Sequence, residues 1–254
     1  MLTTRMSCKE MFDNLVADKE KIDLKEKYLL SKAIKELKKK NSFPAHVKYE
    51  YKIPATRNNY IIFFYAANRH SVENPKVNHF CELFDDNNKR FILKWGVSPY
   101  SHCENSKPTL LRQIHAYTSH FFQRYKERFL KDESLMANDV ACRYFSRNGN
   151  DYFPIDITTD INNNIEKYGM VGKKGFVVTD GFCCTNSCLE GTLSENRADD
   201  KVDAMLVIFT TFISKNEMSE KQYESIKKGK TELISKFLND FETKYKGEEF
   251  VLYK

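Results

Sequence analysis

The segment KVDAMLVIFTTFIS, residues 201–214, places the strongest constraint on the fold, because it is apolar on both sides of an extended chain. Successive side chains of a strand point to opposite faces, so Val207 and Phe209 share one face while Leu206 and Ile208 share the other. A strand with two apolar faces needs cover on both of them. We therefore predict that this segment is a central strand of a sheet with other elements packed against it.

Two stretches of the chain carry further strand patterns, with alternating or continuous apolar residues bounded by turn residues. In the first stretch the residues DDNN have the short polar side chains that favour a hairpin turn, so an antiparallel sheet is expected there. The strands predicted in the first stretch cover 46–53, 60–67 and 80–97, followed by a loop at 98–108. Those predicted in the second cover 175–184, a short strand within 188–196, and 201–214, and residues 154–157 form a short strand or extended piece before it.

Helical periodicity separates and flanks these strands. Predicted helices cover 7–40, 109–130 and 136–148, and a last helix follows a capping-box pattern formed by Ser219 and Gln222. The expected fold class is therefore α+β, with antiparallel sheets, central helices and helices at both chain ends. We expect a single domain over 1–254; a subdivision into residues 1–108 and 109–254 stays open.

Composition narrows the class of protein. Hydrophobic residues make up 41% of the chain and aromatic residues 13%, which is typical of a folded, soluble protein. The longest apolar run, AMLVIF, is far shorter than the roughly 20 residues of a membrane-spanning helix. The first residues lack the apolar region of a signal peptide, and the seven cysteines are irregularly spaced. We therefore expect a cytoplasmic protein that has no membrane partner.

Net charge and cysteine spacing bear on whether the protein binds a polyanion or a metal ion. A formal net charge of +6 permits a polyanionic partner such as RNA without requiring one. The run CCTNSC brings Cys183, Cys184 and Cys188 together, but it lacks the second Cys or His pair of a structural zinc site. We therefore predict no metal and no cofactor.

The segment TLLRQIHAYTSHFFQRYKERFL, residues 109–130, contains the strongest candidate site. On a helical wheel its two sectors differ sharply in polarity. The apolar sector holds Leu111, Ile114, Phe121, Phe122, Tyr125 and Phe129, and the polar sector holds Gln113, Tyr117, His120, Arg124, Glu127 and Arg128. His120, Arg124 and Arg128 are spaced four residues apart, so they follow one edge of the helix, and Glu127 can pair with Arg124.

These residue types suit chemistry on a phosphodiester. Cleavage of RNA without a metal needs a base for the 2′-hydroxyl proton, and imidazole exchanges protons near neutral pH. It also needs donors for the charge that develops on phosphate, and guanidinium groups grip phosphate oxygens in pairs. We therefore interpret His120 as the acid–base group and Arg124 and Arg128 as phosphate ligands. Tyr117 could stack on a base, and Gln113 is the further polar contact.

The run YTSHFFQRYKERF resembles the H-x3-R-x3-R helix of small ribonuclease-toxin-type domains in the RelE, barnase and EndoU-like group. In that group a His-bearing helix precedes a short antiparallel sheet, whose late apolar strand carries Thr before an aromatic residue; here FTTFI takes that place. The resemblance spans roughly residues 109–214. It implies the same roles for His120, Arg124 and Arg128, and it adds Thr210 or Thr211 as a polar neighbour. Because these two threonines alternate, only one of them can face the site.

Three classes of function follow. The first is a metal-independent, toxin-like ribonuclease or RNA-binding protein, for which Lys173 and Lys174 in GMVGKKG are additional contacts to an anionic partner. The second is a non-enzymatic interaction or assembly protein with a protein partner, such as an antitoxin-like chain. The third is a hydrolase whose site is assembled from residues far apart in the sequence.

Overall fold

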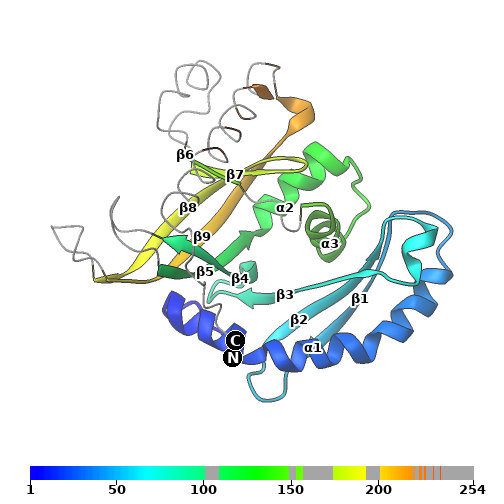
Figure 1. Ribbon diagram of the computed structural model, residues 1–254, viewed down its shortest axis with the longest axis horizontal. Coiled ribbons are helices and arrows are strands. Elements are labelled where there is room, and N and C mark those ends of the chain that lie inside the picture. Colours follow the sequence, from blue (N-terminus) through cyan, green and yellow to red (C-terminus); the bar gives the residue numbers. More distant parts are fainter. Residues whose placement is uncertain are drawn as a thin grey trace.

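The computed structural model in Figure 1 describes residues 1–100, 109–148, 153–156, 174–192 and 201–218, together with a few single residues after 218. The elements are α1 (Cys8–Lys38), β1 (Ala45–Lys52), β2 (Asn59–Ala66), η1 (Arg69–Val72), β3 (Lys76–Phe84), β4 (Arg90–Tyr100), β5 (Thr109–Thr118), α2 (Ser119–Tyr125), η2 (Lys126–Leu130), α3 (Ala137–Asn148), β6 (Phe153–Asp156), β7 (Lys174–Val178), β8 (Gly181–Thr192), β9 (Lys201–Ser214) and η4 (Lys215–Glu217).

The described strands form one nine-stranded sheet in the order β1-β2-β3-β4-β5-β9-β8-β7-β6. All neighbours are antiparallel except β5 and β9, which run parallel over six residue pairs. The α+β class and the mainly antiparallel sheet are thus confirmed. β4 and β5 lie on either side of residues 101–108 and pair over ten residues, so the sheet continues across the boundary that the sequence left open.

Helix α1 covers one face of the sheet (Figure 1). It begins with a capping box, in which the Ser7 hydroxyl accepts from the Glu10 N–H and the Glu10 carboxylate accepts from the Ser7 N–H. The carboxylate of Glu190, from β8, also accepts from the Cys8 N–H, where the helix dipole favours negative charge. The helix runs unbroken to Lys38, and it buries Met11, Phe12, Leu15, Ile22, Leu29, Ala33 and Leu37.

Helices α2 and α3 cover the other face (Figure 1). Of the apolar residues predicted to face the core from 119–130, Phe121, Phe122 and Tyr125 are buried, and Phe129 is partly buried against the same cluster. Each buried aromatic side chain contributes roughly 2–3 kcal/mol of transfer free energy, so this cluster is a large part of the core. Strand β9 supplies Phe209 and Phe212 to the same cluster. They lie three residues apart, so a regular strand would point them to opposite faces. A β-bulge between Phe209 and Phe212 shifts the register with β8 and brings both side chains to one face.

The predicted helix over residues 109–130 is wrong in its first half. Residues Thr109–Thr118 form β5, and the helix begins only at Ser119, where the Thr118 hydroxyl accepts from the Phe121 N–H. Strand β5 lies between β4 and β9 and is buried on both faces, so its apolar residues do not alternate and mimic a helical period. Pairing with two neighbours decides the conformation of this segment.

Smaller differences concern the ends of elements. β4 extends to Tyr100, into the stretch predicted as a loop. The strand predicted over 175–184 is wrong in its bounds, because it covers β7, a turn and the start of β8, and the short strand predicted within 188–196 overlaps only the end of β8. The predicted helix at 136–148 is confirmed as α3. The helix expected after Ser219 lies for the most part outside the described residues.

A buried polar network fastens α2 and α3 to the turn between β7 and β8. The Asp180 carboxylate is fully buried and accepts from Tyr125 Oη at 2.7 Å and from Asn148 Nδ2 at 2.9 Å. The guanidinium of Arg147 donates two further bonds of 2.9 Å to it. Because its oxygens are fully satisfied, the buried charge stabilises this arrangement, and loss of the carboxylate would leave several donors unpaired.

The substitution Asp180→Asn should therefore lower the free energy of unfolding by about 2–4 kcal/mol, because it removes the charge that faces Arg147. Urea unfolding measures this change. The matched control is Asp86→Asn, whose partner Arg5 is exposed to solvent, and this change should stay within about 0.5 kcal/mol. Equal losses in the two variants would show that the Asp180 network does not stabilise the fold.

Candidate functional site

The three basic residues predicted as the site, His120, Arg124 and Arg128, are not gathered around an open site on α2 and η2. His120 is exposed on α2, and Arg124 donates to Glu127 at 2.9 Å, which confirms the predicted pair. Arg128 donates to the carbonyl oxygen of Phe212 at 2.7 Å and lies 3.6 Å from Glu217. Arg128 thus ties η2 to the end of β9, whereas the side chain of His120 faces solvent.

The other predicted contacts belong to the sheet. Tyr117 is 1% exposed in β5 and stacks on Phe209 with 4.1 Å between ring centroids, so it cannot stack on a base without unpacking the core. Gln113 is also buried in β5, where its side chain bonds Ser98 and His115. The prediction that both residues share a helix face with His120 is therefore wrong, because residues 109–118 form a strand.

The remaining predicted site residues are separate from these. Thr210 donates to the carbonyl oxygen of Cys184 at 3.2 Å, and Thr211 pairs with Cys184 across the sheet. Lys173 lies outside the described residues, and for Lys174 only the backbone, in β7, is described. The contact of these lysines with an anionic partner stays a prediction.

A different site lies where the sheet opens between β3 and β4. These two strands pair over only four residues, Cys81–Phe84 with Arg90–Leu93, although both continue well beyond the last pair. A cavity of about 190 Å³ lies beside this opening. Its lining, which we call the β3–β4 pocket, consists of Leu15, Ile22, Tyr60, His79, Cys81, Leu93, Lys94 and Trp95.

Lys94 lies in the opening itself. Its ammonium donates to Asn78 Oδ1 at 2.6 Å and lies 4.9 Å from the ring centroid of Phe145, which belongs to α3 on the far face. No carboxylate lies within ion-pair distance of Lys94 among the described residues. A charged amine is costly in such surroundings. Burial therefore lowers the pKa of Lys94 to about 8, and the more distant Glu26 only partly opposes this change.

The pocket also has an oriented imidazole, on the face of the sheet that α1 covers. His79 Nδ1 lies 2.7 Å from Glu26 Oε1, in the geometry by which a carboxylate fixes an imidazole and leaves Nε2 for proton transfer. Both side chains are partly exposed, at 27% for His79 and 15% for Glu26, so solvent reaches the dyad. Glu26 comes from α1 and His79 from β3, so the dyad spans the helix and the sheet.

The inner wall of the pocket is held in place by a second buried carboxylate. Asp18 is fully buried and accepts from Tyr60 Oη at 3.0 Å, from Asn58 Nδ2 at 2.6 Å and from the Thr56 hydroxyl at 2.9 Å. Burial is the main cause that raises the pKa of both Tyr60 and Cys81, so both stay protonated. They form the wall of the pocket, which Lys94 and His79 also line.

His115 lies next to Lys94, on the face of the sheet that α2 and α3 cover. The two residues are direct partners of β4 and β5, and the ring of His115 contacts Phe209 at 5.5 Å between centroids. Burial, and then the charge of Lys94, lowers the pKa of His115 to about 4, so its ring is neutral near pH 7. His115 therefore adds no second positive charge beside Lys94.

Sequence reasoning did not find the β3–β4 pocket. Its polar residues come from four elements, and Lys94 looks like an ordinary outward-facing residue of an alternating strand in FILKWGV. The available signal was weak: a single Lys between apolar residues of a predicted inner strand. Only the early end of the β3–β4 pairing turns that residue into a buried amine.

Within the described part of the chain, no group of three or more His, Cys, Asp and Glu side chains is arranged to hold a metal ion. None of the helices in this described part is long and apolar enough to cross a membrane.

The lowered pKa of Lys94 makes stability depend on pH in a defined direction. Between pH 8 and about 10 the unfolded chain keeps this proton while the folded chain releases it, so the contribution of Lys94 to stability rises with pH. The free energy of unfolding of the wild type should rise by about 2 kcal/mol from pH 7 to pH 10 when it is compared at each pH with that of Lys94→Met. Urea unfolding at both pH values measures the difference, and a constant offset would contradict a buried amine.

Comparison with known proteins adds no assignment: neither a family model, nor a curated protein, nor a solved structure matches this chain.

Proposed function

We propose that the β3–β4 pocket is the active site of an enzyme that binds a small carbonyl compound and activates it as an imine with Lys94. The observation that carries this proposal is the position of Lys94, which lines the cavity and whose half-buried ammonium has no carboxylate within ion-pair distance among the described residues. Lysines act as nucleophiles in proteins when such surroundings keep a fraction of them neutral.

The pKa of Lys94 supports this role quantitatively. With a pKa of about 8, roughly one amine in ten is neutral at pH 7, against fewer than one in a thousand for an ordinary lysine. The neutral amine can attack the carbonyl carbon. The N–C bond forms, the carbonyl oxygen takes up a proton, and loss of one water molecule then gives the imine.

The dyad of His79 and Glu26 supplies proton exchange for these steps. Imine formation needs a proton for the departing oxygen and later a base for the carbon next to the imine. His79 Nε2 suits both tasks, because Glu26 holds the other ring nitrogen. The cavity volume of about 190 Å³ favours a compact substrate of several heavy atoms, such as an aldehyde, a ketone or an oxo acid.

The proposal is tested by trapping the imine. The protein is incubated with glyceraldehyde or pyruvate and treated with sodium borohydride, which converts an imine into a stable secondary amine. We expect a mass increase at Lys94 in a peptide map, and a rate of trapping that follows the neutral fraction of an amine with a pKa near 8. Labelling spread evenly over exposed lysines would contradict the proposal.

Two variants separate chemistry from folding. Lys94→Arg keeps a cation in the opening but cannot form an imine, so trapping should be lost while the protein stays folded. His79→Gln keeps a polar contact to Glu26 but cannot exchange protons, so trapping should slow by about 10²-fold or more. Lys48→Arg, on the exposed side of β1, is the matched control and should leave trapping unchanged.

A second candidate function is the cleavage or binding of RNA at α2. It is favoured by His120 and Arg124, which lie one helical turn apart with their side chains open to solvent, and by Glu127, which orients the guanidinium. Arg128 contributes less to this surface because its guanidinium is bound to Phe212. The interaction function remains a further hypothesis, for which the exposed Leu24 and Tyr28 of α1 are candidate contacts.

The RNA hypothesis predicts cleavage of single-stranded RNA in the presence of EDTA by the wild-type chain and its loss in His120→Ala. Gel analysis of a labelled oligonucleotide measures this difference. Because His120 is exposed, the substitution should not change stability, which thermal unfolding checks. Equal activity of the two proteins, or none in either, would exclude cleavage by this residue.

A further inference from the structure

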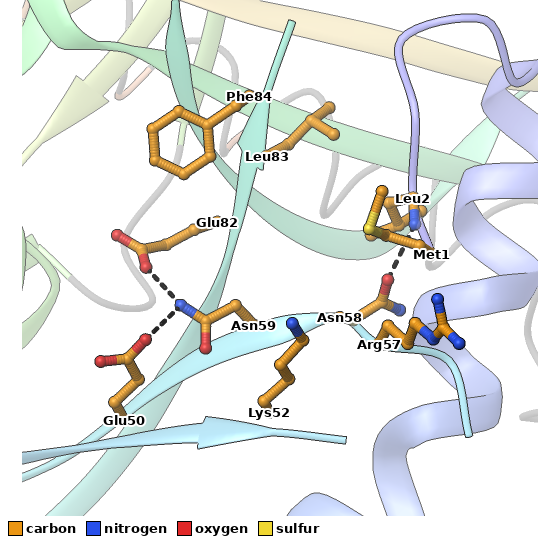
Figure 2. A pocket seen from close by; sticks show the side chains of 10 residues that line it. All are labelled: Met1, Leu2, Glu50, Lys52, Arg57, Asn58, Asn59, Glu82, Leu83 and Phe84. Atoms are coloured by element: carbon orange, nitrogen blue, oxygen red, sulfur yellow. Dashed lines mark hydrogen bonds between the residues drawn. The ribbon is translucent and has the colours of Figure 1, made fainter. Parts of the chain in front are cut away.

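A second pocket lies at the ends of β1, β2 and β3, away from the opening that holds Lys94. Its volume is about 280 Å³, and Figure 2 shows the side chains that line it. Its apolar lining includes Leu2, Leu83 and Phe84, and Phe84 is 51% exposed. Its charged lining consists of two acids, Glu50 and Glu82, and two bases, Lys52 and Arg57.

The acidic side is organised around Asn59. Its Nδ2 donates to Glu50 Oε1 at 2.9 Å and to Glu82 Oε2 at 2.8 Å (Figure 2). The other atom of the same amide, Asn59 Oδ1, is buried and has no hydrogen-bond partner among the described residues. A buried acceptor without a donor is costly, so a ligand that brings an N–H group here would gain from pairing with it.

The two acids differ in what they can offer. Glu82 is 10% exposed and its other oxygen already accepts from both Nε and a terminal nitrogen of Arg90, at 2.9 and 2.6 Å. Glu50 is exposed and its described hydrogen bond is the one from Asn59. Glu50 and Asn59 Oδ1 therefore provide the acceptors that an ammonium group needs.

The basic side is formed by the turn that joins β1 to β2. Arg57 has a φ of 58°, which is unusual for a residue with a side chain, and its N–H donates to Ile53 O at 2.8 Å. Next to it, Asn58 is buried and fixed by Asp18 and by the Leu2 N–H, which donates to Asn58 Oδ1 at 2.8 Å. The turn thus holds an arginine at the pocket, close in sequence to Lys52.

We infer that this pocket binds a small zwitterion, a free apolar α-amino acid, with its ammonium on the Glu50 and Asn59 side and its carboxylate on the Lys52 and Arg57 side. Leu83 and Phe84 then receive the apolar side chain. Opposite charges on the two sides of one cavity suit a ligand that carries an ammonium and a carboxylate on one carbon atom. This inference is independent of Lys94 and of the imine chemistry.

Isothermal titration calorimetry with L-leucine, L-methionine and L-phenylalanine tests the inference. We expect saturable binding of at least one of them. For that amino acid, the analogue without the carboxylate (leucinamide for leucine) and the analogue without the amine (4-methylpentanoate for leucine) should each bind at least tenfold more weakly. Absence of saturable binding for all three amino acids, or binding of either analogue as tight as that of the amino acid itself, would overturn it.

Variants locate the binding. Glu50→Gln and Arg57→Gln should each raise the Kd at least tenfold, and both positions are exposed, so thermal unfolding should confirm that the variants stay folded. Glu73→Gln, which removes an exposed ion pair with Lys38 on another part of the surface, should leave the Kd unchanged. Lys94→Met should also leave it unchanged. Binding that survives both Glu50→Gln and Arg57→Gln would exclude this pocket.

Discussion

The packing of α1 across both parts of the sheet is the interaction on which the rest of the structure depends. Four residue pairs between β3 and β4 are the direct link between the strands β1–β3 and the larger group that includes β4, β5 and β9. Helix α1 spans that link, because its core cluster takes Val47 and Ile62 from one group and Ile114 and Ala204 from the other. At roughly 1.5 Å per residue its 31 residues extend about 46 Å, enough to cover the junction. The strands β3 and β4 can therefore diverge beyond their four residue pairs while α1 holds the two groups of strands together.

Two buried carboxylates play different parts in this frame. Asp180 faces a guanidinium, so its charge is neutralised where α2 and α3 meet the β7–β8 turn. Asp18 is held by the hydroxyl groups of Thr56 and Tyr60 and by the amide of Asn58, and it fastens α1 to the start of β2. Asn58 lines the pocket in Figure 2 and Tyr60 lines the β3–β4 pocket. One buried group thus positions a wall of each cavity.

The sequence was informative where an element's own pattern decides its structure. Helix α1, the hairpin of β3 and β4, the helix α3 and the two-sided burial of β9 all follow from local periodicity and turn residues. The prediction of a helix failed for residues 109–118, because apolar and polar residues do not alternate in a strand that is buried on both faces. Leu111 and Ile114 then fall on one side of a helical wheel by coincidence. Thr118, a good N-cap, was the signal that the helix starts there.

The candidate sites were even harder to predict from local sequence patterns than the fold. The pair of Arg124 and Glu127 was predicted, because it depends on spacing within one helix. The surroundings of Lys94 were beyond such reasoning, because they depend on where two strands stop pairing and on side chains from α1, β3 and α3. The missing partner of Asn59 Oδ1 is equally a property of the assembled sheet ends. Chemistry that arises from burial cannot be read from residue types alone.

The parallel pairing of β5 with β9 has a consequence for how the chain folds. All other neighbouring strands are antiparallel, and most of them follow one another closely along the sequence, so they can pair soon after synthesis. The partner of β5 on its other side is β9, which is synthesised more than 80 residues later, after α2, α3 and the described strands β6, β7 and β8. Until then β5 presents an unpaired, apolar edge, the feature by which folding intermediates associate with one another. The centre of the finished sheet is thus the last part of it to close.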